Sequence, residues 1–248
     1  MLDDVTIAVT SFLRHGCLRA CLKGIAANLP ECEVAVVDDS DTDLCADAAE
    51  EWTYEGCIRL PFDSGLTAKR NAAVRACQTR YWFCGADDFD FSTGGFRGGL
   101  IAAADLLDSH PEIDLVGGRV DGRPYESNLE YDAQANVIRE HRLVPDGSPY
   151  QKCDLVVNAF LARTATLREV PWDEDVSPIG GEHGQFFWHM KKAGKTTVWL
   201  PGWNINTLSL GCGPDVQDPR YGNFRRRAVT AGHAIMLRKE GIKDWIGA

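Results

Sequence analysis

The chain has 248 residues, of which 44% are hydrophobic and 25% charged, a balance typical of a folded globular protein rather than a disordered or fibrous one. Its formal net charge of −10 argues against the broad basic surface that binds phosphate backbones without sequence preference. This length is enough for one large α/β domain, which is the organisation we expect.

The cysteines and the apolar runs bear on cellular location. Nine cysteines are scattered along the chain without a CxxC pair of zinc or thioredoxin type. Several, such as Cys32, Cys84 and Cys153, fall in apolar runs where cysteine packs as a small hydrophobe. We therefore expect most to be reduced and buried, which favours a cytoplasmic location. We expect no membrane span, because no run of about 18 apolar residues occurs.

The first half of the chain alternates short apolar runs with helical patterns, which predicts a mostly parallel sheet flanked by helices. The predicted strands are residues 5–10, 34–37, 57–60 and 81–84. The predicted helices follow the first and third of these strands, at residues 17–25 and 65–77.

The second half continues the α/β pattern and adds a polar stretch with several prolines. Further helices are expected at residues 94–108 and 180–194, further strands at 113–116, 155–161 and 197–200, and a hairpin with loops within 121–150. We divide the single domain into a nucleotide-binding half (1–118), an acceptor-binding half (119–210) and a C-terminal helical segment (211–248).

Carboxylates follow two of the predicted strands directly. Asp38 and Asp39 end the second strand, and Asp87, Asp88 and Asp90 follow the fourth. Ligands of open α/β sheets bind just outside the carboxyl ends of the strands. Three carboxylates within four residues repel one another unless they are solvated, hydrogen-bonded or bridged by a cation. Mg²⁺ or Mn²⁺ beside a diphosphate would bridge these three carboxylates. Asp38 and Asp39 could equally cap the helical segment that follows them or bind a nucleotide.

Cations gather at the predicted helix start that follows Gly65. Lys69 and Arg70 lie in its first turns, where the helix dipole favours negative charge. A bound diphosphate or a base carbonyl would explain them, and the alternative is two side chains extended into solvent. The run Arg225–Arg227 leaves the same choice open, between a phosphate contact and a solvated helix face.

Three segments, Val34–Asp41, Gly65–Asn71 and Tyr81–Phe91, together resemble the inverting GT-A glycosyltransferases of the family-2-like group. The segment Val156–Thr164 resembles the ganglioside-type β1,4-N-acetylgalactosaminyltransferase branch of that group. The resemblance covers about residues 5–200. It implies a GT-A fold and an enzyme that transfers a sugar from a UDP-sugar to an acceptor hydroxyl with inversion.

The resemblance also implies roles for the residues at the strand ends. Asp38 or Asp39 would contact uracil, Arg70 would help to hold the base, and Asp87 and Asp88 would serve the ribose and the metal. The complete predicted nucleotide site is Thr10, Asp38, Asp39, Gly65, Lys69, Arg70 and Asp87, and the predicted ligands of Mn²⁺ or Mg²⁺ are Asp88 and Asp90.

Two departures from the family pattern concern the metal. Ala86 stands where the family often has its first aspartate, so the metal motif is either Asp87-Asp88 or Asp88-x-Asp90. Trp203–Thr207 occupies the region of the family's late metal-binding histidine, which has no counterpart here.

The segment Gly180–Phe187 resembles the Gly-Gly-Glu-Asp segment in which related inverting transferases place their catalytic base. An inverting transfer needs a group within hydrogen-bond reach of the acceptor hydroxyl, and either Glu182 or His183 is the predicted base. In the register of the acetylgalactosaminyl branch, Gln185 takes the place of the carboxylate. We further expect Trp172 or Trp203 to line the acceptor cleft.

Missing motifs disfavour other nucleotide enzymes. No GxGxxG follows the first strand and no GxxxxGK[ST] occurs, which argues against dinucleotide and P-loop enzymes. The acceptor is left open as a glycan, a protein or a modified nucleic acid. The alternatives are a transferase acting on modified DNA or on a viral or bacterial protein, and a catalytically degenerate nucleotide-binding module, which Ala86 and His183 favour.

Overall fold

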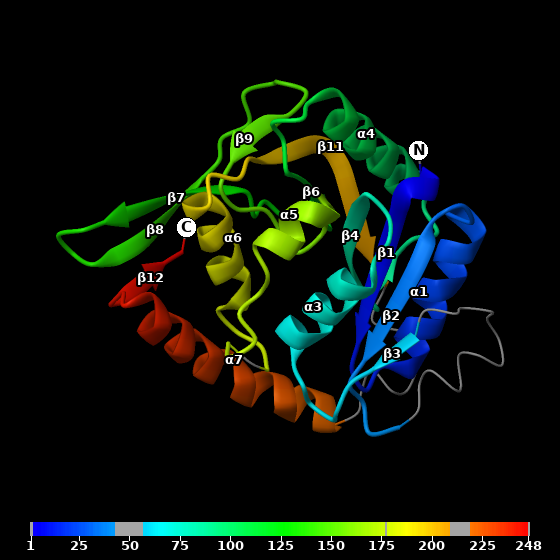
Figure 1. Ribbon diagram of the computed structural model, residues 1–248, viewed down its shortest axis with the longest axis horizontal. Helices are drawn as coiled ribbons and strands as arrows, with labels where there is room; N and C mark the ends of the chain where they lie inside the picture. The colour runs from blue at the N-terminus through cyan, green and yellow to red at the C-terminus, as the bar shows by residue number, and fades with distance from the viewer. Residues whose placement is uncertain (1, 43–56, 177, 209–218, 248) are drawn as a thin grey trace.

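The computed structural model describes residues 2–42, 57–176, 178–208 and 219–247, without the side chains of residues 219 and 225–228. The Arg225–Arg227 prediction therefore concerns side chains outside the described part. Within it the chain is a mixed α/β fold built on one large sheet with helices on both faces, as the sequence predicts (Figure 1).

The large sheet has the strand order β3-β2-β1-β4-β10-β6-β11-β5, with β9 paired to β11. Its parallel core is β1 (Val5–Ser11), β2 (Glu33–Asp38), β3 (Cys57–Arg59) and β4 (Tyr81–Ala86). It continues through β10 (Phe160–Arg163), β6 (Leu115–Val120), β11 (Thr197–Thr207), β5 (Phe89–Asp90) and β9 (Gln151–Cys153). Strands from both halves of the sequence therefore share one sheet.

The strands are apolar on both sides because helices cover both faces of the sheet. Along β1, Ile7 and Val9 join one core cluster and Ala8 joins the other. Helices α1 (His15–Asn28) and α4 (Gly94–Ser109) pack on the first face. Helices α3 (Leu66–Ala76), α5 (Thr164–Glu169) and α6 (Glu182–Lys192) pack on the second face.

A short turn, a small second sheet and a long helix complete the described chain. A 3-10 turn, η1 (Leu2–Asp4), precedes β1. A separate sheet of β7 (Ser127–Asp132), β8 (Val137–Arg142) and β12 (Asp244–Ile246) extends to one side, and its hairpin was expected. The long helix α7 (Pro219–Glu240) runs along the edge where the parallel strands end (Figure 1).

Two predicted strands have different bounds in the structure. The strand expected at residues 155–161 begins only at Phe160, because Leu155 is instead bridged to Ser127. The strand expected at 197–200 continues to Thr207, since its pairing with β6 resumes at Asn204 after an irregularity around Pro201. Proline lacks the N–H that a ladder needs, which accounts for the break in pairing between Trp199 and Asn204.

Cys17 and Cys57 each take part in a disulfide bond, so the expectation of reduced cysteines is wrong for these two. Cys21, Cys77 and Cys84 are free and buried, as expected. Because disulfides persist in oxidising compartments, the cysteines no longer argue for a cytoplasmic location. Among the described residues, no helix is both long and apolar enough to cross a membrane.

Trp203 is a core residue rather than a residue of an open cleft. It is fully buried against Phe83 and Phe96, with ring centroids 5.7 and 6.2 Å away. Gly99 of α4 faces the same indole, and a Cβ at Gly99 would overlap its atoms.

We predict that Gly99→Ala lowers the free energy of unfolding by about 1–3 kcal/mol, because the added methyl group overpacks the core at Trp203. The matched control is Gly98→Ala, the preceding residue of α4, whose Cβ would meet nothing within 4 Å. That change should raise stability by about 0.5–1 kcal/mol. Urea unfolding of both variants measures the difference, and equal stability of the two would refute this account of the packing.

Candidate functional site

A pocket of about 280 Å³ opens at the edge of the sheet where the parallel strands end. Its walls come from the ends of β1 and β4, the start of α3, the turn before β10 and the first turns of α7. Of the predicted nucleotide-site residues, the structure brings Thr10, Asp39, Gly65, Lys69 and Arg70 to this surface, together with Asp88 of the predicted metal pair.

Asp39 and Lys69 form an ion pair on one wall of the pocket. Lys69 Nζ lies 2.5 Å from Asp39 Oδ1 and donates to the Ser11 backbone oxygen at 3.0 Å. The other carboxylate oxygen of Asp39 accepts from the Gly65 N–H at 2.9 Å. Gly65 has a φ of 92°, a backbone conformation that favours glycine. Asp39 is therefore held by the start of α3.

Asp38 lies behind this wall and is not on the pocket surface. Its side chain is fully buried, and Oδ1 accepts from the Ser40 hydroxyl at 2.7 Å, whereas Oδ2 has no partner. Burial raises the pKa of this carboxyl. Of the two aspartates that end β2, only Asp39 can reach a ligand in the pocket as it stands.

Arg14, which the sequence analysis did not select, holds both Asp87 and Asp88. It is ion-paired with Asp87 through two nitrogens and donates to Asp88 Oδ2 at 2.9 Å. Ser11 donates to Asp87 at 2.8 Å. Burial raises the pKa of Asp87 to about 6, against the opposing charge of Arg14. A single cation thus balances the two carboxylates at the end of β4.

Asp90 points away from the pocket. Its Oδ1 accepts from the Ser92 backbone N–H at 2.9 Å and from the Ser92 hydroxyl at 2.5 Å. Asp88 and Asp90 therefore do not converge on one point. Within the described residues, no group of three or more histidine, cysteine, aspartate or glutamate side chains is placed to hold a metal ion.

Arg70 is a buried cation without a carboxylate partner. Its side chain lines the pocket and is 4% exposed, and Nε and Nη1 are buried without a hydrogen-bond partner. Its guanidinium lies over the Trp172 ring, 5.5 Å from the centroid. An uncompensated buried charge is costly, so this side chain is arranged for a ligand oxygen.

Neither predicted base reaches the pocket surface. Glu182 is buried and accepts from the Gly180 N–H at 2.6 Å, at the start of α6. His183 Nδ1 lies 2.5 Å from Asn158 Oδ1, and Asn158 does line the pocket. Burial and the nearby Arg70 charge lower the pKa of His183 to about 3. His183 is therefore neutral near physiological pH.

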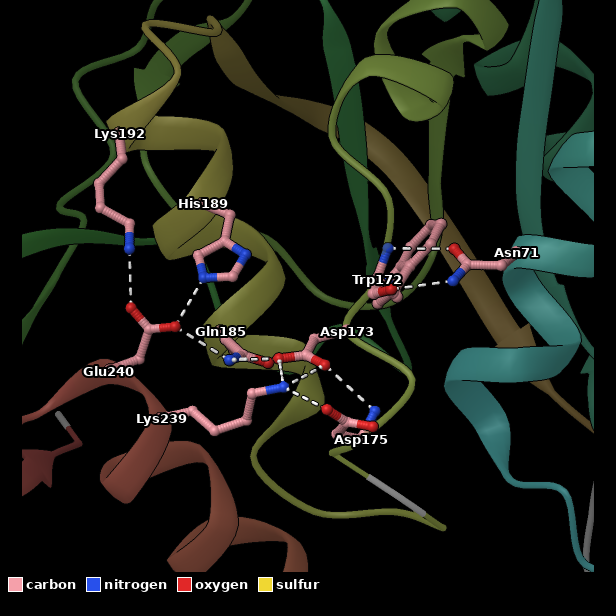
Figure 2. A network of polar contacts seen from close by, with 9 residues as sticks. All are labelled: Asn71, Trp172, Asp173, Asp175, Gln185, His189, Lys192, Lys239 and Glu240. Carbon is pink, nitrogen blue, oxygen red and sulfur yellow. Dashed lines mark hydrogen bonds and ion pairs between the residues drawn. The ribbon is translucent and has the colours of Figure 1, made fainter.

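Gln185 belongs to a polar network that ties α6 to α7 (Figure 2). Its amide donates to Glu240 at 2.9 Å, and the same carboxylate receives His189 and Lys192 at 2.6 and 2.7 Å. Trp172 exchanges two backbone hydrogen bonds with the Asn71 amide (Figure 2). This network holds the elements behind the pocket in place.

We predict that His183 makes stability fall with acid. Its pKa is lowered in the folded chain, so the unfolded chain takes up the proton first as the pH drops. The stabilisation is complete above pH 6.5 and is lost as the pH falls toward 3. His183→Asn should flatten this dependence by up to about 1.4 kcal/mol per pH unit. Urea unfolding between pH 7.5 and 4.5 measures it, with the exposed His141→Asn as control. Identical slopes for wild type and His183→Asn would contradict the assignment.

Comparison with known proteins connects this site to a family. The family described as Glycosyl transferase family 2 matches residues 6–166. Beta-1,4 N-acetylgalactosaminyltransferase 2 of Mus musculus is 35% identical over 193 residues, which cover 74% of this chain and 35% of the relative. Beta-1,4 N-acetylgalactosaminyltransferase 1 of Homo sapiens is 35% identical over 198 residues, with the same coverage. The chain thus spans about a third of the length of these relatives.

Solved structures share the fold at low sequence identity. S. aureus TarS (residues 1–349) superimposes with a TM-score of 0.56 at 18% identity, over 86% of this chain and 62% of that chain. GalNAc-T7, solved with UDP, GalNAc and Mn²⁺, superimposes with a TM-score of 0.64 at 11% identity, over 82% of this chain and 43% of that chain.

Proposed function

The chain belongs to glycosyl transferase family 2 and has the GT-A fold, and on this premise we propose that it transfers a sugar from a UDP-sugar to an acceptor hydroxyl. The relatives that it matches are N-acetylgalactosaminyltransferases, which supports a hexose or an N-acetylhexosamine as the transferred sugar. The acceptor class stays open among glycans, proteins and modified nucleic acids.

The observation that carries this proposal is that two guanidinium nitrogens of Arg70, Nε and Nη1, have no hydrogen-bond partner among the described residues. A nucleoside diphosphate supplies the oxygens that its Nε and Nη1 groups lack. We assign the diphosphate or the uracil carbonyl to Arg70, and uracil contact to Asp39, because Asp38 lies behind the pocket wall. Thr10, Gly65 and Lys69 complete the nucleotide side.

Three aromatic rings cluster on the nucleotide side of the pocket. Phe12 and Phe224 line the pocket, and Phe62 packs against both, with ring centroids 5.5 Å apart in each case. An apolar wall of this kind suits the flat face of a base. The arrangement therefore supports a nucleotide rather than a bare sugar phosphate.

A divalent metal fits this pocket only through Asp88 together with phosphate oxygens of the bound donor. Arg14 contacts both Asp87 and Asp88, but the Asp87 side chain is fully buried whereas that of Asp88 is 33% exposed, and Asp90 accepts from Ser92. Mg²⁺ is commonly held by one or two carboxylates plus substrate phosphates, so Mn²⁺ or Mg²⁺ on Asp88 is compatible with the donor set. Such an ion would neutralise charge on the departing UDP.

The proposed reaction is a single displacement with inversion. The protein's part is to position the two substrates and to stabilise the charge that develops on UDP, for which Arg70 and Arg14 are placed at the pocket. A general base is most effective when its pKa lies near the operating pH, which disfavours His183. Of the two residues predicted from sequence, Glu182 is therefore our proposed base.

A second candidate function is a module that binds nucleotide without transfer. Its support is that Glu182 and His183 both lie off the pocket surface and that Ala86 ends β4. Nucleotide binding without turnover against any acceptor would favour it.

We predict that UDP binds in calorimetry and that Arg70→Met weakens this binding about 10- to 100-fold, because hydrogen bonds to a charged group are worth about 1.5–3 kcal/mol. Arg75→Met is the matched control, since Arg75 lies on the same helix with its side chain 65% exposed. Absence of UDP binding to the wild-type protein, with and without Mn²⁺, would refute the proposed function.

The Asp88→Asn variant tests whether Asp88 holds a divalent metal ion. If Mn²⁺ strengthens UDP binding through Asp88, the variant should bind UDP with the same affinity in Mn²⁺ and in a chelator, whereas the wild-type protein should differ between them. A variant that keeps the Mn²⁺ effect would show that Asp88 does not hold the ion.

Glu182→Gln should lower the rate of UDP release from the donor in the presence of an acceptor about 100-fold or more, the range expected for loss of a general base. Its affinity for UDP should stay within about twofold of wild type, since Glu182 is off the nucleotide side. An unchanged rate would remove Glu182 from the mechanism.

A further inference from the structure

Asn158 stands at a tight turn on the pocket surface. The Ala159 N–H donates to the Val157 oxygen at 2.7 Å, which closes a γ-turn centred on Asn158. This turn leads into β10, which runs antiparallel between β4 and β6. The beginning of β10 therefore lies at the edge where β4 and β6 end, and the turn presents Asn158 there to the pocket.

The orientation of the Asn158 amide is fixed by His183. The Asn158 amide oxygen can only accept a hydrogen bond, and the His183 ring nitrogen that contacts it is Nδ1. The ring proton therefore sits on Nδ1, and Nε2 has no partner among the described residues. The same Nδ1 lies 2.5 Å from Asn158 Oδ1, which consequently accepts from it.

His183 itself is held in place by packing. Its ring lies 5.1 Å from the Tyr125 ring and 5.2 Å from the Phe187 ring, both in edge-on contacts. These ring contacts and the hydrogen bond to Asn158 hold the partly buried imidazole in one orientation. It therefore fixes the amide of Asn158 from behind the pocket.

The free end of the amide is its NH₂ group. With Oδ1 engaged by His183, Nδ2 has no hydrogen bond to any residue in the described part of the chain. Arg70, whose charge acts on His183, lines the same pocket with Nε and Nη1 also unpartnered. Asn158 and Arg70 thus add only N–H donors to the pocket, a chemistry that selects oxygen acceptors.

The sheet order separates Asn158 from the nucleotide side. Ser11 and Asp39 belong to the ends of β1 and β2, on one side of β4, whereas β10 lies on the other side. In a donor whose uridine occupies the β1–β2 side, the diphosphate lies near the end of β4. The sugar then extends toward Asn158.

We propose that Asn158 is a specificity-determining residue, whose Nδ2 group donates to an oxygen on the donor sugar, and that His183 is the positioning residue that orients it. The oxygen is a ring hydroxyl or an N-acetyl carbonyl. This inference rests on the proposed UDP-sugar function and gives His183 a role other than that of the predicted base.

Calorimetric titration of UDP, UDP-Glc, UDP-Gal, UDP-GlcNAc and UDP-GalNAc tests it. The variants are Asn158→Leu, which keeps the size of the side chain without its donors, His183→Phe, which keeps the ring packing without the N–H, and the double variant. Asn128→Leu, exposed on β7, is the control. Thermal unfolding of each variant verifies that the fold is intact.

The wild-type protein should bind at least one UDP-sugar more tightly than UDP. Asn158→Leu should reduce this preference about three- to tenfold, the value of one neutral hydrogen bond, and leave the Kd of UDP unchanged. His183→Phe should reduce the preference for the UDP-sugar less than Asn158→Leu does. The double variant should lose no more of this preference than Asn158→Leu alone, because the two residues act through one contact.

Three results would overturn the inference while the proposed function stands: an unchanged sugar preference in Asn158→Leu, a loss of affinity for UDP itself in that variant, or a wild-type protein that does not distinguish UDP-sugars from UDP. Additive losses in the double variant would overturn the positioning role of His183. Failure of the wild-type protein to bind UDP at all refutes the proposed function instead.

Discussion

The site depends on one electrostatic constraint. The carboxylates of Asp87 and Asp88 follow β4 at a point where the sheet is buried on both faces, and their charges must be compensated. Asp87 is fully buried, and the Arg14 guanidinium and the Ser11 hydroxyl offset the cost of that burial, with a smaller contribution from the charge of Lys69. The same guanidinium reaches Asp88 on the pocket surface.

Helix α7 belongs to the site although it follows the rest of the fold in sequence. Tyr221 and Phe224 line the pocket, and the Arg14 guanidinium lies 4.9 Å from the Tyr221 ring centroid. The helix can lie this close because Gly180 and Gly232 meet, where a Cβ on either would collide with backbone atoms. Its far end is tied to α6 through Glu240 (Figure 2). The pocket is thus closed by contacts between segments far apart in the chain.

Much of the fold followed from local patterns. Period and composition predicted the parallel strands and their order of appearance, and the rule that ligands lie at strand carboxyl ends brought Asp39 and Asp88 to the right edge. Arg14 was missed because its partners Asp87 and Asp88 lie 73 and 74 residues further along the chain, and no local pattern reveals such a long-range pairing. A cation just after the first strand was the available signal. Asn158 was missed because its role depends on a histidine 25 residues away.

A crystal structure of the protein with a bound UDP-sugar would test the central claim most directly. The account predicts uracil against Asp39, an oxygen of UDP on the Arg70 guanidinium, and the sugar beside Asn158. A nucleotide bound elsewhere, or one in this pocket that leaves Arg70 without a partner, would contradict it.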